Sequence, residues 1–159
     1  MQRFTKIVLT VLLASPLFSL ASEEANQFGF SIPMQEKGAE TFYINANLAG
    51  MEQVQFMVDT GSGYTTINEQ SLTSLQQQGK AVFVKQLKGI LADGTIKIVP
   101  VYRISTIRLG KECLLNDIEA AVFPGKTRQI LGLSALKKAG PFIFSFQPPT
   151  LVLSHCDQA

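Results

Sequence analysis

Asp59, Thr60 and Gly61 stand directly after a short apolar run at residues 56–58. Such a run is typical of a buried strand, where an ionised carboxylate is seldom placed without a partner or a task. A carboxyl group can act as a general acid or base when its surroundings adjust its pKa. The glycine permits a close approach of the backbone. This pattern makes Asp59 the leading candidate for chemistry, against the alternative of an ordinary turn residue at the end of a strand.

The other reactive residues are too few for several familiar mechanisms. His155 is the only histidine, so a Ser-His-Asp or Cys-His enzyme would have to use it. Its neighbour Cys156 would point to the opposite face of an extended strand, which leaves Cys113 as a nucleophile only if that thiol is unbonded. One histidine and two cysteines without C-x-x-C or H-x-x-x-H spacing form a poor zinc set, and there is no G-x-x-x-x-G-K phosphate loop. The sequence therefore predicts no metal and no cofactor.

The first residues have the pattern of an export signal. Arg3 and Lys6 give a positive start, and residues 7–20 are almost entirely apolar before the small residues of "SLAS". No cysteine follows the apolar run, so a lipoprotein anchor is not expected. An uncleaved membrane anchor is the alternative, but Pro16 and the shortness of the run argue against a full span. We therefore expect a signal peptide at 1–21, a periplasmic or secreted protein, and no stable membrane insertion after cleavage.

The charge balance excludes one class of partner. The chain has 14 basic and 12 acidic residues, and the expected signal contains two of the basic and none of the acidic ones, which leaves 12 of each. No basic stripe remains, so a nucleic-acid partner is not expected. The chain is 46% apolar and 16% charged, which suits one domain with a real core.

The two cysteines have a simple interpretation in an exported protein. An even number of cysteines in an oxidising compartment indicates a disulfide, here between Cys113 and Cys156. Loop entropy predicts that a bond closing roughly 44 residues stabilises the fold by about 4 kcal/mol. Two separate buried thiols are the alternative.

Alternation and turn residues predict a mostly β fold. Apolar and polar residues alternate over 41–50, and a second strand leads into Asp59. Asn68 is a good N-cap for a short helix that ends at Gly79. The "ADG" at residues 92–94 is a hairpin signal between two β-rich stretches.

The rest of the chain continues the same pattern. We expect a turn at 109–112, a strand at 118–123, a short helix at 133–140 and closing strands at 142–146 and 150–153. Many short strands with tight turns and two short helices indicate a mostly β barrel. One domain at 41–159 would follow an N-terminal extension at 22–40.

The chain resembles a single-lobe, retropepsin-like aspartic protease of the kind that bacteria export. "VDTGS" at 58–62, a flap-like hairpin at 88–98 and "ILG" at 130–132 follow one another in the family's order. The resemblance covers about residues 41–153. It implies the single-lobe acid protease barrel as the fold.

The resemblance also implies residue roles. Asp59 would be the catalytic carboxylate, and Thr60 would reach across to the loop of a partner subunit. Gly61 would bring its N–H to the carboxyl group, and Ser62 would either donate a hydrogen bond to Asp59 or cap the turn. Four residues at the tip of the flap would cover the substrate: Leu91, Ala92, Asp93 and Gly94. An inner strand would support the Asp59 loop, and it consists of Ile130, Leu131 and Gly132.

One chain has one Asp-Thr-Gly, whereas aspartic protease chemistry uses two carboxyl groups that share a proton. We therefore expect a homodimer that hydrolyses extended peptides or proteins through a water held between two Asp59 carboxyls. Gly63, Tyr64 and Leu133 depart from the retroviral pattern, which has acidic residues and an arginine there. A retropepsin-like domain that binds peptides with little or no cleavage is the alternative function, and a β-barrel adaptor without an active site is a third.

Overall fold

The computed structural model describes residues 28–157 of the 159-residue chain. The expected signal peptide at 1–21 lies outside the described residues. Within 28–157, no helix is long and apolar enough to cross a membrane.

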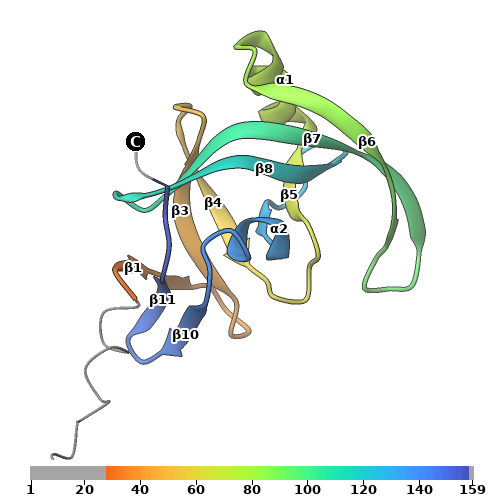
Figure 1. Ribbon diagram of the computed structural model, residues 1–159. Helices are drawn as coiled ribbons and strands as arrows, with labels where there is room; N and C mark the ends of the chain where they lie inside the picture. Colours follow the sequence, from red (N-terminus) through yellow and green to blue (C-terminus); the bar gives the residue numbers. More distant parts are fainter. Residues whose placement is uncertain (1–27, 158–159) are drawn as a thin grey trace, which may run out of the picture.

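Eleven strands and two short helices make up this part of the chain (Figure 1). In chain order they are β1 (Phe30–Pro33), β2 (Gln35–Glu36), β3 (Phe42–Leu48), β4 (Gln53–Val58), β5 (Thr65–Asn68), α1 (Glu69–Gln77), β6 (Ala81–Ile90), β7 (Ile96–Leu109), β8 (Cys113–Phe123), β9 (Ile130–Leu131), α2 (Leu133–Leu136), β10 (Phe142–Phe146) and β11 (Pro149–Leu153).

Eight of the strands form one sheet, in the order β2-β3-β4-β9-β5-β8-β7-β6. An additional pairing of β3 with β7, from Ala46 opposite Leu109 to Leu48 opposite Ile107, curls the sheet back on itself. The mostly β barrel expected from the sequence is confirmed.

The core follows from the alternation along the strands. In β3 the four apolar residues are buried and the three polar ones between them are half-buried, as predicted. The fully buried side chains of neighbouring strands meet them inside the barrel; the largest include Phe56, Ile104, Ile107 and Leu115. Asn68 caps α1 as predicted, because its Oδ1 accepts a hydrogen bond from the Ser71 N–H at 2.9 Å.

The strands β6 and β7 form the long hairpin that arches away from the barrel in Figure 1. The two strands pair from Ala81 opposite Ile104 to Ile90 opposite Ile96. The turn closes where the sequence predicted it, with the Leu91 N–H donating to the Thr95 carbonyl at 2.8 Å. The hairpin expected at 88–98 is therefore present, and its strands pair well beyond that range.

A separate three-stranded sheet, in the order β1-β11-β10, lies at the lower left of Figure 1. The sequence showed only an extension at 22–40, whereas the structure forms β1 and β2 within it. These strands have four and two residues, too few for alternation to reveal them. The predicted disulfide is confirmed, and it joins Cys113 at the start of β8 to Cys156 beyond β11, with 5.1 Å between their Cα atoms.

Candidate active site

Asp59 lies in the loop between β4 and β5, and the short strand β9 holds the start of this loop. Val58 pairs with Leu131 in parallel register, and the Asp59 N–H donates to the Leu131 carbonyl at 3.1 Å. On the other side of β9, Thr66 of β5 pairs with Ile130. The structure thus places β9 between the two strands that flank the loop, where the resemblance placed its inner support.

The Asp59 carboxyl group is oriented by its own loop. The Gly61 N–H donates to Oδ1 of Asp59 at 2.8 Å, and a Cβ atom at Gly61 would lie 3.1 Å from that oxygen. Asp59 is half-buried and Thr60 is exposed. One carboxylate oxygen therefore has a fixed backbone donor, while Thr60 is free to meet another molecule.

The Ser62 hydroxyl does not make the bond to Asp59 that was considered from the sequence. It donates to the Tyr64 carbonyl at 2.8 Å, and a hydroxyl group has only one proton to donate. Ser62 therefore shapes the turn, which was the alternative.

Gly132 lies where the backbone of the loop passes closest to the inner strand. A Cβ atom there would be 2.2 Å from the Tyr64 carbonyl oxygen and 2.9 Å from the Ser62 carbonyl oxygen. The next residue, Leu133, donates its N–H to that same Ser62 carbonyl at 2.8 Å. Only glycine permits this approach, because any side chain would force the two backbones apart.

Ser134 is a supporting residue that sequence reasoning missed. Its Oγ accepts a hydrogen bond from the Thr65 N–H at 2.8 Å and donates to the Glu119 carbonyl at 2.7 Å. It thereby connects α2 to β5 and β8. Its position two residues after the glycine of "ILG" was the only sequence signal.

A cleft of about 760 Å³ lies between the Asp59 loop and the hairpin. Of the predicted flap residues, Leu91 and Ala92 line this cleft, whereas Asp93 and Gly94 lie outside its lining at the exposed turn. Hydrogen bonds from the hydroxyl and the backbone N–H of Thr95 lower the pKa of the Asp93 carboxyl group. Asp93 therefore closes its own turn and does not face the substrate space.

The walls of the cleft are largely apolar. Tyr64, which departs from the retroviral pattern, lines the cleft. Sequence analysis missed several other wall residues, which come from β5, the hairpin and the end of β8; they include Thr66, Leu87, Val99, Ala121 and Phe123. Alternation along the hairpin strands could have identified Leu87 and Val99, which are opposite one another in the register. A largely apolar space beside a carboxylate suits a ligand with apolar groups.

On its other side, Asp59 borders an aromatic pocket of about 540 Å³, lined by Glu40, Thr41, Phe42, Met57, Val58, Asp59, Thr60, Phe144 and Phe146. The rings of Phe42 and Phe144 lie edge to face with centroids 5.2 Å apart, and Phe146 lies 5.6 Å from Phe42. Phe146 is 64% exposed. Asp59 and Thr60 thus separate the cleft from an apolar surface.

No three His, Cys, Asp or Glu side chains gather into a possible metal-binding group within residues 28–157. The Asp59 loop therefore presents one carboxyl group, backbone donors and hydroxyl groups as its chemistry.

The family model described as "gag-polyprotein putative aspartyl protease" matches residues 44–138, which is more than half of the chain. The chain belongs to this family. The match covers the Asp59 loop, the hairpin, β9 and α2, and it ends before β10.

Solved structures show the same fold. The crystal structure of a retropepsin-like aspartic protease from Rickettsia conorii is similar, with a TM-score of 0.58 and 18% sequence identity. The similar region covers 79% of this chain and 93% of that one. No curated protein matches the chain. The single-lobe, retropepsin-like fold is thereby shown.

Replacing Gly132 with alanine should destabilise the protein by about 2–3 kcal/mol, because the new methyl group would overlap the Tyr64 carbonyl. Chemical denaturation measures the change. Gly63→Ala is the matched control, since nothing lies within 4 Å of a Cβ atom there. Equal stability of the two variants would contradict the close approach.

Proposed function

We propose that this protein is an aspartic endopeptidase that is active as a homodimer. The observation that carries the proposal is the Asp59 carboxyl group, held by the Gly61 N–H at the edge of a peptide-sized cleft. The family membership supports it, since the family is named for aspartyl proteases.

The chemistry needs a second carboxyl group. Among residues 28–157, Asp59 is the only carboxylate that lines the cleft, so this part of the chain offers half of a catalytic pair. Two Asp59 side chains on a two-fold axis would share one proton, and one would act as base and the other as acid. A water between them would attack the peptide carbonyl, while the hairpins of both subunits would close over an extended substrate. This reaction uses no cofactor.

The aromatic pocket offers a surface for the second copy. It includes Asp59 and Thr60, so a molecule that covers it also approaches the carboxyl group. Phe146 of β10, which lines the pocket, is 64% exposed, although an apolar side chain of this size gains free energy on burial. An apolar surface that borders half of an active site favours a second copy of the chain as its occupant.

The backbone of β10 supports the same interface. Within the described residues β10 is the edge of its sheet. The Pro149 carbonyl accepts from the Met34 N–H at 2.9 Å, on the side of β11 that faces away from β10. The backbone N–H and C=O groups of successive strand residues point to alternate sides of the strand. Those of Ser145 therefore point at β11, and those of Phe144 and Phe146 point at the free edge of β10. Such an edge can pair with an identical strand, antiparallel across a two-fold axis.

Asp59→Asn should reduce peptide hydrolysis to background while the fold stays intact, because an amide can serve neither as base nor as acid. Peptide turnover and circular dichroism are measured on both proteins. Residual turnover by pure Asp59→Asn protein would contradict the catalytic role. Peptide binding without turnover by the native protein would support the alternative of a peptide-binding domain.

Phe146→Asp should weaken the dimer at least tenfold and make activity per subunit depend more steeply on concentration, because the charge would be buried at the interface. Sedimentation measures the dissociation constant. Phe83→Asp is the control, since Phe83 is also exposed, at 51%, but lies on β6 outside the aromatic pocket. An unchanged dissociation constant for Phe146→Asp would exclude this surface.

We further propose that the protein is exported. The proposal rests on the signal-like pattern at residues 1–21 and on the disulfide between Cys113 and Cys156, a bond typical of oxidising compartments. Protein recovered from the periplasm or the medium should begin at Ser22 on N-terminal sequencing. Protein that stays in the cytoplasm would contradict export, and exported protein that still begins at Met1 would contradict cleavage.

A further inference from the structure

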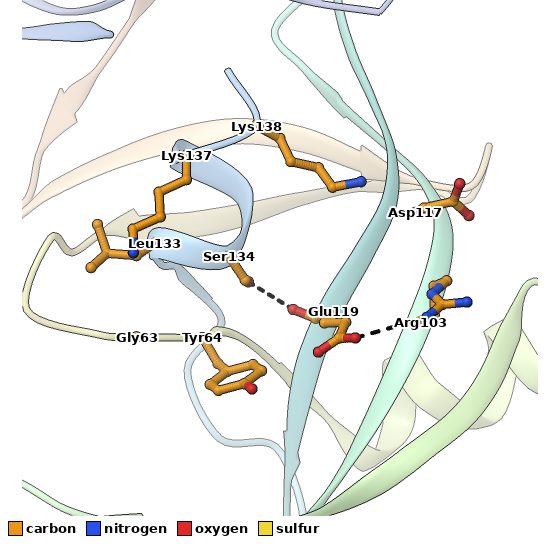
Figure 2. Close-up of a pocket in the computed structure, with 9 residues that line it drawn as sticks. All are labelled: Gly63, Tyr64, Arg103, Asp117, Glu119, Leu133, Ser134, Lys137 and Lys138. Atoms are coloured by element: carbon orange, nitrogen blue, oxygen red, sulfur yellow. Dashed lines mark hydrogen bonds and ion pairs between the residues drawn. The ribbon is translucent and has the colours of Figure 1, made fainter. Parts of the chain in front are cut away.

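A third cavity, the lateral pocket, adjoins the cleft beyond the Asp59 loop (Figure 2). Its volume is about 530 Å³. Gly63 and Tyr64 line both this pocket and the cleft, so the two spaces share one wall. The remaining lining residues come from β7, β8 and the region of α2; they are Arg103, Asp117, Glu119, Leu133, Ser134, Lys137 and Lys138.

The shared wall is fixed by an ionic network. Glu119 accepts a hydrogen bond from the Lys85 ammonium at 3.0 Å and lies 3.8 Å from the Arg103 guanidinium. The same ammonium group lies 5.4 Å from the centre of the Tyr64 ring. Hydrogen bonding to Tyr64 and to Glu119 raises the pKa of Lys85. The Glu119 carboxylate is thus already paired with two cationic side chains.

Two lysines of the lateral pocket have no carboxylate partner among residues 28–157. Lys137 and Lys138 follow α2, and the Lys138 ammonium donates to the Asn116 carbonyl at 2.8 Å. Among residues 28–157, neither lysine has a carboxylate oxygen within 4.0 Å. Figure 2 shows Asp117 at the far side, with its carboxylate turned away from Tyr64 and Lys137. The lateral pocket therefore has two cations available and its inner carboxylate already neutralised.

We propose that the lateral pocket is a distal subsite of the cleft, and that it attracts an acidic side chain of a peptide substrate by the positive charge that Lys137 and Lys138 give to its lining. This rests on the proposed function, because it requires a peptide in the cleft. An extended peptide that passes Gly63 and Tyr64 reaches the lateral pocket, and its side chains alternate between the two faces of its strand. A carboxylate there would meet positive charge that no carboxylate oxygen within 4.0 Å balances among residues 28–157.

The test uses Asp59→Asn protein, so that peptides are bound without being cut. Fluorescent ten-residue peptides with an apolar centre carry Glu, Gln or Lys, in turn, at each position two to four residues from the centre. Anisotropy at pH 7 and low salt gives their affinities. We expect one position at which Glu binds about three- to fivefold more tightly than Gln, the range for partly exposed ion pairs. The preference should disappear below about pH 4, where the Glu side chain of the peptide is protonated.

Introducing Lys137→Gln and Lys138→Gln together into the Asp59→Asn protein should remove the preference for the Glu peptide. The affinity for the Gln peptide should stay the same. Lys80→Gln with Lys111→Gln is the matched control, because both lysines are exposed and line neither the cleft nor the lateral pocket. The control variant should keep the preference. Equal affinities for Glu and Gln at every position, a preference that survives loss of Lys137 and Lys138, or tighter binding of Lys would overturn the subsite.

The Gln peptides separate this inference from the proposed function. If the native protein cuts Gln and Glu peptides equally well, the subsite is wrong and the protease stands. If Glu is preferred in binding but no peptide is cut, the subsite stands and the proposed catalysis is wrong. If no peptide binds, both are wrong.

Discussion

A side chain at position 132 would lie 2.2 Å from the Tyr64 carbonyl oxygen, so the backbones of the Asp59 loop and the inner strand meet with nothing between them. This contact lets Leu131, just before the glycine, accept the Asp59 N–H. The backbone of Asp59 is therefore held by backbone atoms of an element some seventy residues away in sequence, while its carboxyl group is oriented by the Gly61 N–H of its own loop. Both holding contacts come from backbone atoms and not from neighbouring side chains.

The position of Asp59 between two cavities gives each side of the loop a separate task. On one side lies the cleft, which the hairpin residues Leu87–Ala92 help to line with largely apolar side chains and where the proposed peptide would bind. On the other side the aromatic pocket presents exposed rings that suit a second protein surface. The Gly61 N–H fixes one carboxylate oxygen between them. Substrate binding and dimerisation would therefore meet at one side chain.

Much of the surface proposed for dimerisation, including Phe42, Phe144 and Phe146, lies outside the family match. The match ends at residue 138, before β10 begins. The strands β1, β10 and β11 form their own sheet, and the disulfide from Cys113 to Cys156 ties the end of that sheet to the barrel. The bond restricts the chain that follows β11 and so ties the sheet that contains β10 to the barrel beside the Asp59 loop. The proposed interface would thus combine residues inside the family match with residues beyond it.

The sequence by itself determined the features that depend on neighbours along the chain. The alternation in β3, the cap at Asn68, the hairpin turn and the Asp-Thr-Gly after an apolar strand could all be predicted, because each is set by a few consecutive residues. The tertiary structure alone decided the direction of the Ser62 hydroxyl, the withdrawal of Asp93 from the cleft, the strands of the N-terminal extension and the charges around Lys137. The Ser62 and Asp93 bonds reach only two residues along the chain, but which partner each side chain takes depends on the folded conformation of its turn. The charges around Lys137 depend on contacts between segments far apart in sequence. Strands of two to four residues are too short to carry a periodic signal. Local patterns therefore located the carboxyl group, whereas the cavities on either side of it exist only once the barrel has closed.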